Sequence, residues 1–412
     1  MDLHIDHLTP IATVTMVALL CGFLFMRLRQ PPIVGYIIAG IVLGPTGLAL
    51  IENSDDVQLL AEFGVIMLLF LIGMELSLRG FKTVYKTALG AAGAQMAMSI
   101  SACFIMGAFM EWSFEKIMLF GFAMSLSSTA VAIKILEETG DLRKHSGRLT
   151  VGVLIAQDLA LVPILLAVNA IGTKTALDYT IFLKVFGAVG SLAFLTWFLT
   201  RRERIRFPFT EYMEKRKDLV PLAALALCFT MASISGVIGL STAYGAFIAG
   251  LLIGNSSARV FIHEATMPIQ SVLLMVFFLS IGLLIDMHFI IDNWMLVTGI
   301  LLLVTVFKTL MNIAILHLMG EPWERAFLSG VVMGQIGEFS FVLVATGLSL
   351  GMIGTDDYRL IISVIALSLM FSPIWLVIVR KIDILADEGL NTFRGLIWRL
   401  SKPLGEDQKS KH

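Results

Sequence analysis

Long apolar segments follow one another along nearly the whole chain, and they constrain its fold more than any other feature. A helix needs about 20 mostly apolar residues to cross the hydrocarbon core of a bilayer. Hydrophobic residues make up 57% of the sequence and charged residues only 15%, whereas soluble domains have about 25% charged residues. We therefore predict an all-α membrane protein with about thirteen transmembrane helices. The expected spans are 8–26, 32–50, 58–77, 85–108, 115–137, 148–171, 178–200, 218–238, 241–255, 268–286, 294–318, 323–350 and 358–380.

The charges of the connecting loops predict an orientation. Loops after odd-numbered spans carry most of the Lys and Arg residues, including Arg27, Arg29, Arg79, Lys82, Lys86, Arg143, Lys144, Arg148 and a dense run from Arg201 to Lys217. Basic loops stay in the cytoplasm. We expect the N-terminus outside, the C-terminus in the cytoplasm, and the protein in a bacterial inner membrane. The run from Arg201 to Lys217 is read as a solvated linker, with a binding site for lipid head groups as the alternative.

An internal repeat divides the chain. The segment GYIIAGIVLG at 35–44 recurs as GAFIAGLLIG at 245–254, displaced by 210 residues, and three shorter matches keep nearly the same register. The displacement equals seven spans, an odd number, so the two copies are expected to be inverted relative to each other, as in secondary transporters. We predict six-span repeats at 1–171 and 218–380, a connecting span and loop at 172–217, and a cytoplasmic tail at 381–412.

Two spans contain residues that interrupt a helix. The stretch SLSST, from Ser125 to Thr129, has four hydroxyls in five residues, and GQIGE, from Gly334 to Glu338, lies at the equivalent place in the second repeat. Glycine weakens a helix, and Ser and Thr compete for its backbone hydrogen bonds. We therefore predict discontinuous helices with breaks at Ser125, Gly334 and Gly337, whose freed carbonyls face a polar cavity. Close packing of helices by small residues is the alternative explanation.

Four polar residues lie deep inside apolar spans: Gln157 and Asp158 in AQDLALVP, Lys308 in TVFKTLMN, and Glu338. Ionisable residues at membrane depth are costly and usually functional, and opposite charges there tend to pair. We expect Lys308 to pair with Asp158 or Glu338. A carboxylate at the membrane centre can be neutralised by a proton or by a small cation, but not by both at once, and this exclusion produces coupled exchange.

A family resemblance supports this interpretation. The segments VGYIIAGIVLGPTGL, FGVIMLLFLIGMEL, SLSSTAVAIKIL, LIAQDLALVPIL, FFLSIGLLID and GQIGEFSFVL resemble the cation:proton antiporter-2 family, and most closely its Kef-type potassium/proton antiporters. The likeness covers nearly all of residues 10–380. Many Kef-type proteins carry a C-terminal nucleotide-binding regulatory domain, for which this sequence shows no counterpart up to His412, so the resemblance does not imply nucleotide or glutathione gating here.

The resemblance implies a fold with thirteen spans, a dimerisation half and a core half with two crossed, unwound helices, and a homodimer in the lipid membrane. It implies that Asp158 alternately binds a cation and a proton. The cation and proton site is expected to comprise Asp158, Gln157, Ser127, Ser128, Thr129 and Glu338, with Lys308 as ion-pair partner.

We expect an exchanger of K⁺, with Na⁺ as the alternative cation, for H⁺, without a cofactor or enzymatic activity. Because Asp158 has a neutral neighbour, Gln157, exchange is expected to be electroneutral. A cation channel is less consistent with an inverted repeat and a titratable site, and a divalent or iron transporter would need more carboxylate, His or Cys ligands. An intramembrane enzyme using Ser127 and Lys134 is disfavoured by their separation. Nothing in the near-neutral charge, 30 basic against 31 acidic residues, indicates binding to nucleic acid.

Overall fold

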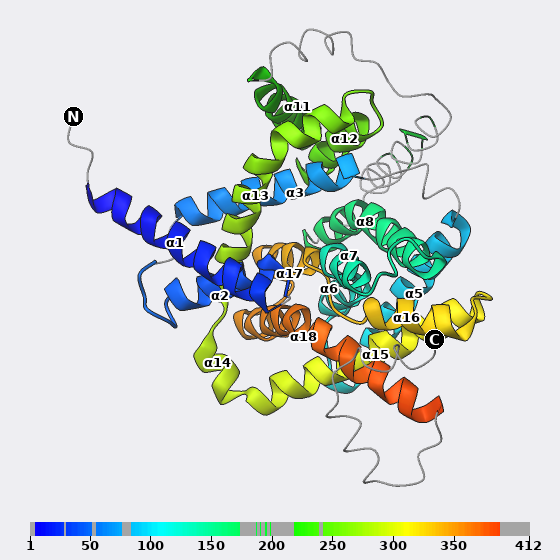
Figure 1. Cartoon of the computed structure of the whole chain (residues 1–412). Coiled ribbons are helices and arrows are strands. Elements are labelled where there is room, and N and C mark those ends of the chain that lie inside the picture. The colour runs from blue at the N-terminus through cyan, green and yellow to red at the C-terminus, as the bar shows by residue number, and fades with distance from the viewer. Residues whose placement is uncertain are drawn as a thin grey trace.

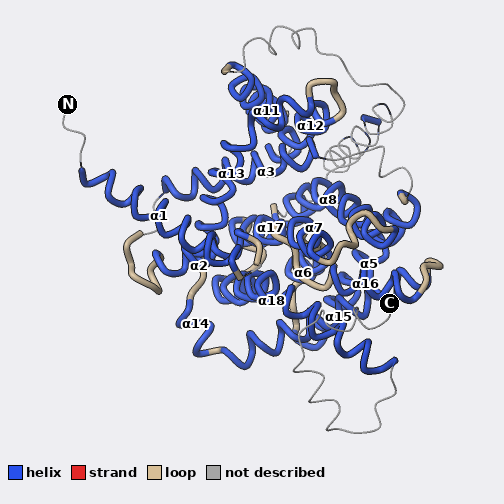
Figure 2. The backbone as a smooth tube through the Cα atoms, in the orientation of Figure 1, coloured by secondary structure: helices blue, strands red, loops and turns tan. Residues whose placement is uncertain are grey.

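The computed structural model describes residues 5–28, 30–51, 55–75, 84–173, 218–238 and 242–387, together with the isolated residues 187, 190, 194, 195 and 198. The seventh expected span, 178–200, lies almost entirely outside the described residues, and so does the basic run from Arg201 to Lys217. The count of thirteen spans therefore stays a prediction. Each of the other expected spans contains one helix or a pair of short helices, and Figure 2 shows how loops join them.

The helices of the first half are α1 (Ile5–Arg27), α2 (Pro32–Leu43), α3 (Asp55–Glu75), α5 (Tyr85–Met110), α6 (Phe114–Ser125), α7 (Thr129–Glu138) and α8 (His145–Gly172). Those of the second half are α11 (Leu219–Val237), α12 (Thr242–Gly254), α13 (Arg259–Leu284), α14 (Met287–Asp292), α15 (Trp294–Leu318), α16 (Trp323–Val332), α17 (Phe339–Ser349) and α18 (Thr355–Asp387). All the elements of the described chain are helices, as expected from the sequence.

Several of these helices are long and apolar enough to cross a membrane. In the described part of the chain, five meet both criteria, namely α5, α8, α11, α13 and α15, and shorter apolar helices accompany them. The helix α13 begins at Arg259, before the expected start of the span at 268, and Pro268 lies inside it. Neighbouring helices in a membrane protein can satisfy the backbone carbonyl that a proline leaves without a donor.

The helices pack into two groups, and each group takes helices from both halves of the sequence (Figure 1). The first group contains α1, α2, α3, α11, α12 and α13, and the second contains α5 to α8 and α15 to α18. Contacts of α2 with α18 connect the groups. The large buried cluster of apolar side chains is drawn mainly from the second group and includes residues of α5, α6, α8, α15, α16 and α17.

Two close crossings in the first group involve glycines that the sequence repeat relates to each other. Gly40 of α2 packs against Gly282 of α13, and Gly250 of α12 packs against the backbone of α3 at Phe70 and at Gly73. A Cβ atom on Gly40 would overlap the carbonyl oxygen of Leu279. The displacement of about 210 residues relates Gly40 to Gly250 and Gly73 to Gly282. The crossing of Gly40 with Gly282 therefore corresponds to the crossing of Gly250 with Gly73. A repeat predicts this correspondence, while the inversion and the boundaries of the repeats stay predictions.

Candidate functional site

The first helix break separates α6, which ends at Ser125, from α7, which begins at Thr129. The Ser125 hydroxyl donates to the carbonyl of Phe122 at 2.7 Å, inside its own helix. Ser128 is the N-cap of α7, and its hydroxyl oxygen accepts from Val131 N at 3.3 Å. Ser and Thr are favoured at such positions because their side chains satisfy backbone groups that a helix end leaves free. The hydroxyl-rich stretch thus ends one helix and starts the next.

The second break separates α16, which ends at Val332, from α17, which begins at Phe339. Ile336 N donates to the hydroxyl oxygen of Ser368 on α18 at 2.9 Å. The expected breakers Gly334 and Gly337 both lie in this segment. The N-terminus of α17, like that of α7, follows directly after the break, and a helix N-terminus carries partial positive charge.

The two breaks cross in direct contact. Gly337 N donates to the carbonyl of Leu126 at 3.1 Å, and the Ser127 hydroxyl donates to the carbonyl of Met333 at 2.9 Å. The Gln335 side chain donates to the carbonyl of Ser128 at 3.3 Å. A Cβ atom added to Gly337 would lie 2.8 Å from the carbonyl of Ser127, so only glycine allows this approach. Three interactions therefore join one unwound segment to the other.

The helix α15 contributes one donor to each break. Lys308 Nζ donates to the carbonyl of Leu126 at 2.6 Å, and Asn312 Nδ2 donates to the carbonyl of Met333 at 3.0 Å. Both side chains are buried. They lie four residues apart and thus on one face of α15. Each of the two carbonyls accepts one donor from the opposite break and one from α15. The expected ion pair of Lys308 with Asp158 or Glu338 stays a prediction.

The helix α8 brings Gln157 and Asp158 to the same crossing. Their exposed fractions are 3% and 4%. The Thr129 hydroxyl, at the first residue of α7, donates to Asp158 Oδ2 at 3.0 Å. Ser127 N donates to Gln157 Oε1 at 2.9 Å. The carboxylate therefore lies against the positive end of a half-helix, which favours an anion.

All the residues expected at the site lie at or next to this crossing. Ser125 and Glu338 differ from the others, because no hydrogen bond described above joins their side chains to the opposite break. Ser125 bonds within α6, and Glu338, 4% exposed, is the N-cap residue of α17. Gln95, Asn312 and Ser368 also bond to the crossing or to Gln157, although the sequence interpretation did not single them out. An amide four residues after Lys308, and so on the same helix face, is the signal in the sequence that could have identified Asn312. A lone amide in an apolar span is the only comparable signal for Gln95.

The side-chain oxygen atoms at the crossing belong to carboxylates, hydroxyls and amides. The backbone carbonyls of Leu126 and Met333 each accept two hydrogen bonds from the protein itself. Among the described residues, no group of three or more His, Cys, Asp or Glu side chains is arranged to hold a metal ion. A multidentate site for a divalent transition metal usually includes such a group.

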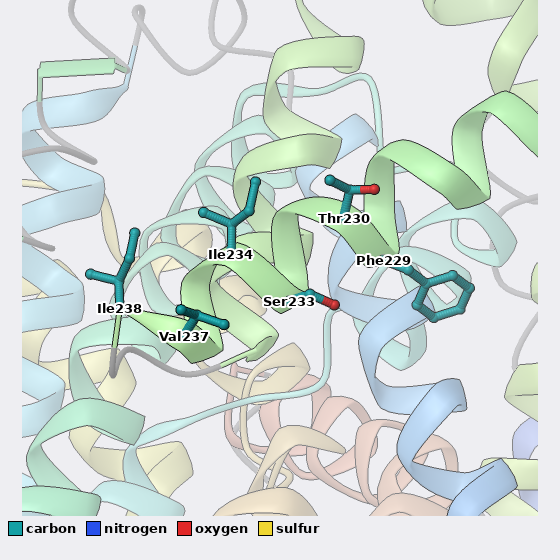
Figure 3. Close-up of a pocket in the computed structure, with 6 residues that line it drawn as sticks. All are labelled: Phe229, Thr230, Ser233, Ile234, Val237 and Ile238. Atoms are coloured by element: carbon teal, nitrogen blue, oxygen red, sulfur yellow. The ribbon is translucent and has the colours of Figure 1, made fainter.

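A separate hollow lies along the surface of α11 in the other packing group (Figure 3). It measures about 460 Å³ and is lined by Phe229, Thr230, Ser233, Ile234, Val237 and Ile238. Its lining is mostly apolar and contains no titratable side chain. This hollow therefore offers none of the chemistry of the crossing.

Comparison with known proteins shows related sequences and a related fold. Residues 15–381 match the family described as "Sodium/hydrogen exchanger, transmembrane". The iron transporter MagA of Paramagnetospirillum magneticum is 45% identical over 97% of this chain and 92% of its own length. The K(+) efflux antiporter 5 of Arabidopsis thaliana is 31% identical over 89% of this chain, which spans 65% of that protein. The sodium proton antiporter MjNhaP1 of Methanocaldococcus jannaschii has the same fold, with a TM-score of 0.68 and 16% identity over 94% of this chain and 100% of that one.

Proposed function

The chain belongs to the sodium/hydrogen exchanger family, and from that premise we propose that it exchanges a monovalent cation for protons by alternating access. One observation carries the proposal: Asp158, a carboxylate only 4% exposed, lies where two broken helices cross. Broken helices at a membrane-embedded site are typical of secondary transporters, because freed carbonyls and half-helix ends contact the ion. The family is one of transporters, and we assign the chain no enzymatic activity.

In this proposal Asp158 binds either the cation or a proton in each half of the cycle. Oxygen ligands for a dehydrated cation come from Ser127, Ser128, Thr129 and Glu338, with Gln157 beside them. Thr129 contacts Asp158 directly, so we place its hydroxyl among the first ligands. The Lys308 ammonium lies on the Leu126 carbonyl, at the opposite end of the peptide that Gln157 holds. It supplies positive charge when Asp158 is empty.

We further propose that one cation exchanges for one proton and that K⁺ is preferred over Na⁺. A cation or a proton neutralises the single Asp158 carboxylate equally, and no net charge moves if Lys308 stays protonated. The neutral amide of Gln157 presents a weaker field than a second carboxylate would, which reduces the benefit of removing water from small Na⁺. The relation to a K(+) efflux antiporter supports K⁺, and the shared fold with a sodium proton antiporter keeps Na⁺ as the alternative.

The setting of the protein follows from the same reasoning. We propose a homodimer in a bacterial inner membrane, with the N-terminus outside and the C-terminus in the cytoplasm. The charge of the loops supports this orientation, and the relative in Paramagnetospirillum magneticum supports a bacterial membrane.

Iron transport is the second candidate, because a relative at 45% identity is named an iron transporter. The side chains available as metal ligands at the crossing argue against iron transport. The described residues contain no group of three or more His, Cys, Asp or Glu side chains that could hold a divalent metal ion. A transporter of Fe²⁺ with this site would have to bind the ion through Asp158, Glu338 and neutral oxygens.

The test is transport by the purified protein in vesicles that contain a pH-sensitive dye. We expect imposed gradients of K⁺, and less strongly of Na⁺ and Li⁺, to move protons in the opposite direction. Recordings on a solid-supported membrane should show no net current during this exchange. A current would indicate a second titrating group, with Lys308 and Glu338 as the first residues to examine. Fe²⁺ uptake under anaerobic conditions without K⁺-driven proton movement would instead support the iron transporter.

A further inference from the structure

A buried amide on α5 is connected to the crossing by a line of hydrogen bonds. Gln95 has an exposed fraction of 0%. Its Oε1 accepts from Gln157 Nε2 at 2.8 Å, and Gln157 Oε1 in turn accepts from Ser127 N at 2.9 Å. Gln95 thus belongs to the hydrogen-bond network around Asp158, and in the described structure it joins that network through Gln157.

The direction of this line is fixed by its first member. A backbone N–H can only donate, so Gln157 must present its oxygen to Ser127 and its nitrogen to Gln95. Gln95 must then present its oxygen to Gln157, because two NH₂ groups cannot bond each other. The amide orientations follow from the chemistry of the donors, without any choice between oxygen and nitrogen in either side chain. Gln95 Nε2 has no hydrogen-bond partner in the described structure, so the line ends at Gln95.

In the other direction, the hydrogen bonds continue from Ser127 N across the Leu126–Ser127 peptide to the carbonyl of Leu126. The described peptide bonds include no cis bond, and the N–H and C=O of a trans peptide point in opposite directions. Ser127 N–H points to Gln157 on α8, so the carbonyl of Leu126 points away from α8. That carbonyl accepts from Lys308 Nζ at 2.6 Å and from Gly337 N at 3.1 Å. The peptide between Leu126 and Ser127 is therefore held at both ends.

We propose that Gln95 is a positioning residue of the exchange site. It orients Gln157, which orients the Leu126–Ser127 peptide, and this peptide fixes the position of the Lys308 ammonium. The inference rests on the proposed exchange function. If the Gln157 amide loses its bond to Gln95, it can rotate, and the peptide then loses its fixed orientation. The Leu126 carbonyl no longer holds the ammonium at one distance from the cation site. Gln95 thereby affects cation affinity and pH dependence without touching the cation.

The first experiment compares Gln95→Leu and Gln95→Glu in the vesicle exchange assay. Leucine removes the hydrogen-bond acceptor for Gln157. We expect the KM for the cation to rise about fivefold, which corresponds to the net free energy of one hydrogen bond. We expect the maximal rate to change less than about twofold, and the pH midpoint of exchange to shift by about half a unit. Glutamate keeps an acceptor oxygen at the same place in either protonation state, and it should restore the KM to nearly that of the unsubstituted protein.

Gln270→Leu is the matched control. Gln270 lies in α13 with 2% exposure, and neither atom of its amide has a hydrogen-bond partner in the described structure. Leucine at position 270 changes burial and packing in a similar way, but it breaks no chain of hydrogen bonds that leads to Lys308. We expect the KM and the pH midpoint of this variant to stay unchanged.

A second experiment does not depend on transport. We expect Gln95→Leu and Lys308→Met to be non-additive in the thermal unfolding of the purified protein, because each acts on the same peptide from opposite sides. Gln270→Leu and Lys308→Met should be additive. An unsubstituted protein that exchanges no monovalent cation for protons would overturn the proposed function, but this cycle would still test the role of Gln95.

Two results would overturn the inference, and a third would remove the hydrogen-bond acceptor from it. One is a Gln95→Leu variant with lowered thermal stability but an unchanged KM and pH midpoint, since a purely structural amide would behave in this way. The other is additivity of Gln95→Leu with Lys308→Met. Failure of Gln95→Glu to restore the KM would also count against an acceptor at this position.

Discussion

Lys308 and Asn312 each donate to a carbonyl that a broken helix has released. A helix end leaves backbone groups without partners, and such groups cost several kcal/mol each where water is absent. The carbonyls of Leu126 and Met333 each receive a second donor from the opposite break. Two side chains on one face of α15 therefore offset much of the cost of interrupting two helices. This arrangement gives Lys308 a structural role besides its charge.

We predict that Lys308→Ala lowers the thermal stability of the purified protein and shifts the pH dependence of exchange. A hydrogen bond to a charged group contributes roughly 1.5–3 kcal/mol, and truncation also leaves a cavity. Differential scanning fluorimetry and exchange at several pH values check both effects. Lys116→Ala is the control, because the ion pair of Lys116 with Asp357 at 2.7 Å lies outside the hydrogen bonds of the crossing, so its loss should leave the pH dependence of exchange unchanged. If both properties of Lys308→Ala match those of the unsubstituted protein, the ammonium does not lie on the Leu126 carbonyl.

At the scale of helices, the site depends on how closely the two breaks approach. The backbone of Gly337 lies against that of Ser127, and the side chain of Ser340 on α17 donates to the carbonyl of Ala123 on α6 at 2.7 Å. One half-helix of each break, α6 and α17, is thereby fixed relative to the other. The position of the Thr129 hydroxyl on Asp158 follows from this crossing.

We therefore predict that Gly337→Ala reduces the rate of exchange at least tenfold, because its Cβ atom would separate the two breaks. Rates in vesicles at equal protein density measure this effect. The control is Gly93→Ala in α5, where an added Cβ atom meets nothing within 4 Å. Alanine in an open helical position should stabilise that helix by about 1 kcal/mol and leave exchange intact. A Gly337→Ala protein with a normal rate would show that the close approach is not needed for transport.

At the scale of the whole molecule, glycine crossings hold the first packing group together. Substitution of Gly40 or Gly250 by alanine would place a Cβ atom against backbone of the facing helix. Because the sequence repeat relates the two positions, we predict that both variants are destabilised by similar amounts, about 1–3 kcal/mol. Thermal unfolding in detergent provides the measurement, with Gly299→Ala as control because its Cβ atom would meet nothing within 4 Å. Unequal losses would count against equivalent crossings.

The sequence was sufficient to predict the fold class, both breaks and most of the residues at the crossing. Asp158, Lys308 and Glu338 are conspicuous because charge is costly in apolar spans, and the breaks are conspicuous because Gly, Ser and Thr interrupt helices. Gln95 and Ser368 were missed because a single amide or hydroxyl in a span is compatible with ordinary packing, and periodicity does not indicate which span it faces. The helix α13 is longer than its expected span because an apolar stretch marks only the apolar part of a helix, and the turns before it contain Arg259, His263 and Glu264.

The most direct test of the central claim is proton movement driven by a K⁺ gradient in vesicles containing Asp158→Asn. Asparagine keeps the size of the side chain but can bind neither a proton nor a cation as a carboxylate does, so we predict no exchange, with folding and membrane insertion retained. Asp357→Asn, which neutralises a carboxylate in the ion pair with Lys116, should exchange normally. Exchange by Asp158→Asn at the rate of the unsubstituted protein would contradict the account.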